Sequence, residues 1–277
     1  MTDAIPQQQK ITINADALRD LGMRGVNRAA GFLGLAFRRP DEPLPTTITM
    51  SEFNRYQFLP EPLPEVMAGE LVQEFNAWLI GNALQELDRH FSLFVDEVWR
   101  LLDLTDAHEK VIPAGFKVSE ISGDTNAGNK FKKVADRLGL PEARPDRLWS
   151  ISNARNCLAH AAGMVTERHA NDNKQRLKLV WLASEIKLVQ GEQFVIIGEY
   201  PIQAPDPEQE AQLVVQMVDR ELTFEIGQQL RLTPVQLHEL CLFYAILIDT
   251  IMVSLGEHFA AKGIPNLPPM DQEARET

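Results

Sequence analysis

Three polar side chains that could take part in catalysis or binding lie close together in residues 150–165, which read SISNARNCLAHAAGMV. Arg155 and Asn156 are adjacent, and His160 follows in the same segment. A histidine titrates near neutrality and can move protons, and a guanidinium presents a fixed fork of donors to a carboxylate or a phosphate. These residues form either a reactive constellation or a polar seam on an ordinary helix.

Helical geometry places the three residues on different faces. At about 100° per residue, Ser152, Asn156 and His160 form a polar stripe opposite an apolar one. Arg155 lies at the edge of the apolar stripe, where a guanidinium needs a carboxylate, a phosphate or a partner chain. Arg155 and His160 point about 140° apart, so within one chain they converge on a single phosphate only awkwardly. The apolar stripe consists of Leu148, Ile151, Ala154, Leu158 and Ala162.

Four helices are predicted to position these residues. The motif helix spans 146–162, with Pro145 as its start signal and Gly163 as its stop. Apolar residues at intervals of three and four predict a long helix over 65–103. A shorter helix is predicted over 130–138 and a terminal one over 234–262, which opens with a proline after a capping threonine.

Strands are predicted between the motif helix and the terminal helix. Residues 177–189 and 193–203 alternate or are β-branched around a glycine, which predicts a β-hairpin or small sheet, and a third strand is expected over 221–226. The predicted domains are therefore an N-terminal arm over 1–64, a helical domain over 65–262 with a β-rich insertion over 166–232, and a disordered tail over 263–277. The arm is expected to hold a short helix and either packs on the main domain or contacts RNA or a partner.

The overall charge limits the classes of partner. With 27 basic and 39 acidic side chains the formal net charge is -12, so the molecule as a whole repels nucleic acid. A nucleic-acid partner therefore requires a local basic patch or a specific cleft. The two cysteines, Cys157 and Cys241, lack the spacing of a zinc site and indicate a reducing compartment. We expect no metal and no cofactor.

The location is expected to be cytoplasmic. No basic start followed by an apolar run opens the chain, so no secretory signal is predicted. The longest apolar run, residues 240–255, is interrupted by Asp249 and is shorter than the about 20 residues that span a bilayer. We interpret it as a central core helix and expect no membrane partner.

The spacing of Arg155, Asn156 and His160, the glycine that closes their helix and the order of the four helices together resemble the HEPN superfamily. The resemblance implies a mainly α fold, an up-and-down helical bundle with a small β-rich insertion between the motif helix and the C-terminal helix. That insertion is larger than a minimal member requires.

The resemblance also implies a metal-independent endoribonuclease. In that chemistry the ribose 2′-hydroxyl attacks the adjacent phosphate and leaves a 2′,3′-cyclic phosphate and a 5′-hydroxyl. His160 suits the proton transfer, Arg155 the stabilisation of the phosphorane, and Asn156 the orientation of His160 or of the scissile phosphate. The implied setting is a toxin-like or antiphage defence effector, and the acidic balance favours a folded RNA such as tRNA.

Nuclease members of this superfamily are commonly dimers in which two motif helices face each other. We therefore expect a homodimer through the motif helix, which would let both chains line one cleft. Ser152 is a supporting residue of the polar stripe. Glu86 is another, because it forms a polar ladder with Asn82 and His90 and could hold Arg155 in a salt bridge when no RNA is bound; a merely solvated face is the alternative for this ladder.

Two other functions remain open on the sequence. The chain could be a non-catalytic HEPN-like module whose motif serves dimerisation or ligand binding, which the acidic balance and the large insertion favour. It could also be a regulatory subunit whose strand-rich insertion binds a partner protein.

Overall fold

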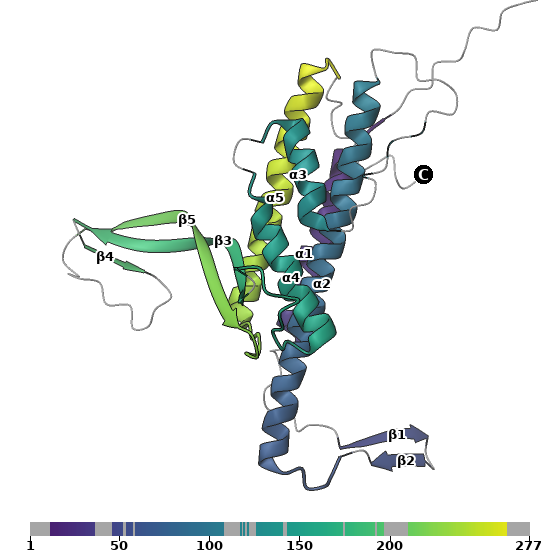
Figure 1. The fold of residues 1–277 in the computed structure, drawn as a ribbon, viewed down its shortest axis with the longest axis vertical. Helices are drawn as coiled ribbons and strands as arrows, with labels where there is room; N and C mark the ends of the chain where they lie inside the picture. Colours follow the sequence, from purple (N-terminus) through teal and green to yellow (C-terminus); the bar gives the residue numbers. More distant parts are fainter. Residues whose placement is uncertain are drawn as a thin grey trace, which may run out of the picture.

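A computed structural model describes residues 12–36, 46–51, 54–57, 59–107, 117, 119, 121, 126–140, 143–173, 175–191, 193–196 and 210–264. Within these ranges the chain is mainly helical, with a small three-stranded antiparallel sheet and a short hairpin (Figure 1). The helices are α1 (Ala15–Ala36), α2 (Glu65–Asp106), α3 (Ala127–Leu138), α4 (Pro145–Ala161) and α5 (Pro234–Ala261). The strands are β1 (Thr47–Ser51), β2 (Asn54–Gln57), β3 (Arg176–Gln190), β4 (Gln193–Ile196) and β5 (Gln212–Glu225).

The long helix α2 is the spine of the bundle. All four other helices contact it, and its 42 residues correspond to about 63 Å at the usual rise of an α-helix. Aromatic rings fill the centre, where Phe91 lies 5.3 Å from Tyr244 and 6.2 Å from Phe131, measured between ring centroids. The apolar spacing that predicts this helix is thus the pattern that builds the core.

Local signals set the ends of the predicted helices. The helices expected over 65–103, 130–138, 146–162 and 234–262 are α2, α3, α4 and α5. Thr233 and Gln236 form a reciprocal capping box at the start of α5. Gly139 ends α3 in the left-handed conformation with φ 66°, which favours glycine.

The N-terminal segment contributes a full helix to the bundle, longer than the short helix that the sequence predicts. In α1, Leu18 and Leu33 are buried, and the helix packs on α2 and α5. Gly25 permits this close approach, because an added Cβ there would lie 2.7 Å from the carbonyl oxygen of Glu86. The side chain of Asn14 accepts a hydrogen bond from the N–H of Ala17 and caps the helix start.

The three-stranded sheet lies between α4 and α5 in the chain, where the β-rich insertion is predicted. Its order is β4-β3-β5, and β3 pairs with β5 from Arg176 opposite Glu225 to Val189 opposite Gln212. The base of β3 packs on the bundle through Trp181 and its buried neighbours, and the outer part of the sheet projects away (Figure 1). The third strand begins nine residues before the predicted 221–226, because its pairing with β3 starts at Gln212. Residues 212–215 are all exposed, so their burial gives no alternating pattern.

Helix α5 lies in the core of the bundle. By length and composition alone it could cross a membrane, a test that buried helices of soluble proteins also pass. Its side chains Leu240, Tyr244, Ile248 and Ile251 are buried against the rest of the fold, as the core-helix interpretation expects. The cytoplasmic location stays a prediction, and residues 265–277 of the predicted disordered tail lie outside the described ranges.

Candidate functional site

Arg155 reaches from α4 to a buried carboxylate on α2. Its Nη2 atom lies 2.8 Å from Oδ2 of Asp88, and the two side chains are 26% and 8% exposed. The hydroxyl of Ser152 donates to the other carboxylate oxygen, Oδ1, at 3.1 Å. The anionic partner that the position of Arg155 demands is therefore supplied within the chain by Asp88.

Opposing effects act on the charge of Asp88. Burial raises the pKa of this carboxyl above its ordinary value, and the nearby charge of Arg155 and the hydrogen bond from Ser152 act against that rise. Burial raises the pKa of the fully buried Tyr244 well above its usual value. The charge of Asp88 raises this pKa further, and the charge of Arg155 acts against the rise. Asp88, Ser152, Arg155 and Tyr244 are hereafter the Asp88 cluster.

Two polar atoms of the Asp88 cluster are left without a hydrogen-bond partner among the described residues. They are the hydroxyl oxygen of Tyr244 and the Nε atom of Arg155. A buried polar atom without a partner costs free energy, so the cluster keeps hydrogen-bonding capacity for a further group.

The predicted environments of Ser152 and Glu86 are wrong. Ser152 is buried and faces α2 instead of lying on an outer polar stripe. Glu86 does not hold Arg155; it lies 2.7 Å from Nε of Arg28 and 3.4 Å from Nε2 of His90. Glu86 and Asp88 are two positions apart, about 200° around the helix, so Glu86 faces α1 while Asp88 faces α4.

Asn156 and His160 lie on the outward side of α4. Asn156 is partly exposed, and His160 is exposed in the last turn. Beyond this turn Gly163 adopts φ 81°, and its carbonyl oxygen accepts a hydrogen bond from the N–H of Leu230 at 2.7 Å. This hydrogen bond ties the end of α4 to the segment that leads into α5, and so holds the last turn, which carries His160, in place.

A second histidine lies near the end of α4. His169 is buried, and its Nδ1 atom accepts a hydrogen bond from the N–H of Thr166 at 3.3 Å. Burial lowers the pKa of His169, and the charges of Arg168 and His160 lower it further. The turn that follows α4 brings His169 within electrostatic range of His160.

Within one chain, Arg155 and His160 do not face a common point. Arg155 is directed inward to Asp88, and His160 is exposed on the outward side, as the expected angle of about 140° between them requires. An exposed imidazole with an adjacent amide can exchange protons with a bound ligand. Arg155 can contact the same ligand only by exchanging its bond to Asp88.

The cysteines have no reactive character. Burial raises the pKa of Cys157 and of Cys241 to about 11, so both thiols stay protonated at neutral pH. No three His, Cys, Asp or Glu side chains among the described residues form a group that could hold a metal ion.

Comparison with protein-family models, with curated proteins and with solved structures found no match to this chain.

Proposed function

We propose that this protein is a metal-independent endoribonuclease with a HEPN-like bundle, in which α2, α3, α4 and α5 run up and down and the three-stranded sheet is inserted between α4 and α5. One observation carries the proposal: α4 presents His160 and Asn156 outward, while its only motif cation, Arg155, is retained by one buried carboxylate. A guanidinium in that position can exchange a carboxylate for a phosphate without a change of fold.

The proposed reaction is an internal transfer at phosphorus. The ribose 2′-oxygen forms a bond to phosphorus as the bond to the 5′-oxygen breaks, which yields a 2′,3′-cyclic phosphate and a 5′-hydroxyl. The proton of the 2′-hydroxyl leaves to a base, the 5′-oxygen gains a proton, and His160 is the group that performs this transfer. Arg155 stabilises the negative charge of the phosphorane, and Asn156 orients His160 or the phosphate.

The site requires two chains in this proposal. Because Arg155 and His160 diverge on one helix, two copies of α4 facing each other would let Arg155 of one copy and His160 of the other act on one phosphate. The proposed protein is thus a homodimer through the motif helix. Its substrate is a folded RNA such as tRNA, and its setting is a toxin-like or antiphage effector that a healthy cell restrains.

The test is RNA cleavage by purified protein in EDTA. We expect fragments of tRNA or total RNA that end in a cyclic phosphate, and a loss of roughly 10²–10⁴-fold for His160→Ala and a comparable loss for Arg155→Ala. His238→Ala, an exposed histidine on α5, is the matched control and should cleave like the wild type. Identical RNA profiles for the wild type and both motif variants would refute the proposal.

A non-catalytic HEPN-like module is the second candidate. The Asp88 cluster favours it, because a buried ion pair with a serine hydroxyl can tie α2 to α4 without any chemistry. The chain could then act as a regulatory subunit that binds a partner protein through the projecting sheet. In this case Arg155→Ala lowers the free energy of unfolding while RNA stays intact for every variant.

A further inference from the structure

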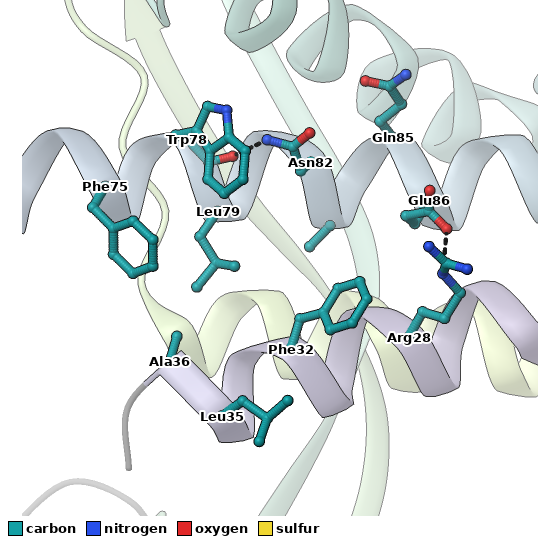
Figure 2. Close-up of a pocket in the computed structure, with 11 residues that line it drawn as sticks. Arg28, Phe32, Leu35, Ala36, Phe75, Trp78, Leu79, Asn82, Gln85 and Glu86 are labelled. Carbon is teal, nitrogen blue, oxygen red and sulfur yellow. Dashed lines mark hydrogen bonds and ion pairs between the residues drawn. The ribbon is translucent and has the colours of Figure 1, made fainter. Parts of the chain in front are cut away.

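Exposed aromatic rings lie between the C-terminal half of α1 and the N-terminal half of α2. Phe32 of α1 and Phe75 and Trp78 of α2 line a groove of about 510 Å³ (Figure 2). The three side chains are 42%, 47% and 63% exposed, in that order. The rings of Phe75 and Trp78 stack, with centroids 6.2 Å apart and 26° between their planes. Flat rings that face solvent are the kind of surface on which nucleic-acid bases stack.

Arg28 adds a positive charge to this aromatic surface. Its Cζ atom lies 5.5 Å from the centroid of the Phe32 ring, and its Nε atom lies 2.7 Å from Oε2 of Glu86. The side chain of Arg28 is 50% exposed and that of Glu86 is 19% exposed, so a ligand meets the guanidinium first. A guanidinium beside an aromatic ring can stack on a base or bind a phosphate.

Two further arginines, Arg24 and Arg89, are exposed at the same end of the groove. Burial lowers the pKa of His90 between α1 and α2, and Glu86 acts against this fall. The charges of Arg24, Arg28 and Arg89 lower the same pKa further, so all three lie within electrostatic range of one side chain. The three exposed rings and these three arginines are hereafter the α1–α2 platform.

The α1–α2 platform is locally cationic on an acidic protein. Arg24 lines an adjoining hollow of about 470 Å³ together with Asp20. Among the described residues that line the two hollows, the carboxylates are Asp20 and Glu86, so three arginines face two carboxylates. The whole chain has a formal net charge of -12. A local excess of positive charge is what a nucleic-acid ligand requires on such a chain.

The outward ridge of α2 carries polar groups that suit the edges of bases. It consists of residues at intervals of three and four, which share one face of the helix: Trp78, Asn82, Gln85 and Arg89. The Nδ2 atom of Asn82 donates to the carbonyl oxygen of Trp78 at 2.7 Å, which holds the amide beside the ring (Figure 2). An apolar partner helix would meet polar side chains along this ridge. A nucleotide strand meets a ring, two amides and a cation in turn.

We propose that the α1–α2 platform binds a single-stranded segment of RNA, with bases stacked on its rings and phosphates bound by its arginines. Glu70 and Glu74 are exposed on α2 before the rings and repel phosphates. The strand therefore extends from Phe75 toward Arg89 and not in the other direction along α2.

This inference rests on the proposed function for the identity of the ligand, because the platform adjoins the motif helix. A Cβ added at Gly81 would lie 3.4 Å from Cβ of Leu158, two positions before His160. Trp78 and Gln85, three positions before Gly81 and four after it, lie on the neighbouring strip of α2. A single strand that leaves the proposed cleft can thus pass onto the platform, and the outward face of α4 stays open to the second chain.

The test is titration of the full-length protein with a fluorescent single strand of about 12 nucleotides of 2′-O-methyl RNA. The methyl group blocks the attacking oxygen, so the wild-type protein cannot cleave this probe. We expect Trp78→Ala and Phe75→Ala each to raise Kd roughly 5- to 100-fold, the loss of one stacked base. Phe194→Ala is the matched control and should bind like the wild type, because Phe194 on β4 is 56% exposed and has Nζ of Lys187 at 4.7 Å from its ring centroid. Circular dichroism verifies that each variant is folded.

The salt dependence of binding distinguishes the arginines from the rings. Each lost phosphate contact to a single strand reduces the slope of log association constant against log salt concentration by about 0.7. Arg24→Ala and Arg89→Ala should each show this reduction, whereas Trp78→Ala should weaken binding at an unchanged slope. Arg100→Ala, an exposed arginine farther along α2, is the control and should change neither quantity. Glu74→Lys should tighten binding, because it removes a charge that repels phosphate.

Three outcomes would overturn the assignment. They are a wild type that does not bind the single strand, a wild type that binds the duplex form of the probe as tightly, and a Trp78→Ala protein that binds like the wild type. The duplex matters because its bases are already paired and stacked on one another. Since the probe cannot be cleaved, binding by a protein that cleaves no RNA refutes the proposed function alone. A wild type that cleaves RNA without binding the probe refutes the platform and leaves the ribonuclease activity.

Discussion

At the scale of single residues, Asp88 decides what Arg155 can do. The carboxylate is buried, burial raises its pKa, and it binds both Arg155 and Ser152. The ion pair therefore gains less than its 2.8 Å distance indicates, because removing the carboxylate from water costs much of the attraction. Such a bond holds the guanidinium in place, and the proposed function requires that a phosphate can replace the carboxylate.

Two substitutions of Asp88 separate the effect of its buried charge from the effect of its hydrogen bonds to Ser152 and Arg155. In Asp88→Asn the amide oxygen can accept from Arg155 and the amide nitrogen can donate to the hydroxyl oxygen of Ser152, while no carboxylate is buried, so we expect unfolding free energies within about 1 kcal/mol of the wild type. Asp88→Ala leaves both donors unpaired and should cost about 3 kcal/mol. Chemical denaturation measures both values.

If the proposed function holds, Asp88→Asn should also affect RNA cleavage. Asp88→Asn removes an ionic competitor of the phosphate and should raise kcat/KM for RNA about fivefold, which corresponds to about 1 kcal/mol. A lower kcat/KM in a stably folded Asp88→Asn protein would show that Asp88 instead holds Arg155 in its working orientation.

The sequence predicts that Arg155, Asn156 and His160 share one helix, but the buried partner of Arg155, Asp88, could not be predicted from it. Arg155, Asn156 and His160 are adjacent in the chain, and their helix follows from local signals. Asp88 lies 67 positions from Arg155, and only packing brings the two together. One signal was available: Asp88 is the acidic residue inside the apolar stripe that includes Leu84 and Phe91, a position that demands a buried partner.

At the scale of elements, the contact between α1 and α2 depends on glycine. A methyl group at Gly25 would lie 2.7 Å from the backbone oxygen of Glu86 and 2.9 Å from Cβ of His90, and neither atom can move freely. Gly25→Ala should therefore push the helices apart and cost about 1–3 kcal/mol.

Gly31→Ala on the same helix is the control for this prediction. Nothing lies within 4 Å of a Cβ added at Gly31, so the substitution should be neutral or should stabilise the protein by up to about 1 kcal/mol. Thermal unfolding of both variants measures the difference, and equal melting temperatures would refute the close packing of α1 on α2.

The sequence predicts element ends well where the signals are local. The proline that opens α4, the capping box at the start of α5 and the glycine after α3 each mark a boundary without reference to the rest of the fold. The full extent of α1 and of β5 could not be predicted in this way. The contact of α1 with α2 depends on the space at Gly25, and β5 is defined by its pairing with β3 along exposed residues.

At the scale of the whole molecule, two buried histidines, His90 and His169, and the half-buried His258 set a pH dependence. Burial lowers the pKa of His90, His169 and His258 below the ordinary value of about 6.5. These histidines therefore bind protons more readily in the unfolded chain than in the folded chain. Their contribution to the free energy of unfolding is fully present above about pH 6.5 and is lost as the pH falls through the lowered pKa values of the folded chain. Asp88 acts in the opposite direction, because its raised pKa favours the fold below the ordinary pKa of Asp, about 3.9.

We expect the melting temperature to fall between pH 7.5 and pH 5.5 at fixed protein concentration. His169→Asn cannot titrate but keeps an acceptor for the N–H of Thr166, so it should reduce this fall. His238→Asn, an exposed position, should leave the fall unchanged. An equal pH dependence in the wild type and His169→Asn would contradict the buried, neutral state of His169.

The most direct test of the central claim, that two chains complete one RNA-cleaving site, is complementation between two inactive variants. Arg155→Ala and His160→Ala proteins are dissociated, mixed in equal amounts and assayed for fragments with cyclic phosphate ends. Each variant alone should be inactive, and the mixture should recover up to about one quarter of wild-type activity, because half of the dimers are mixed and each of these holds one complete site. A mixture as inactive as its components, beside an active wild type, would contradict the claim.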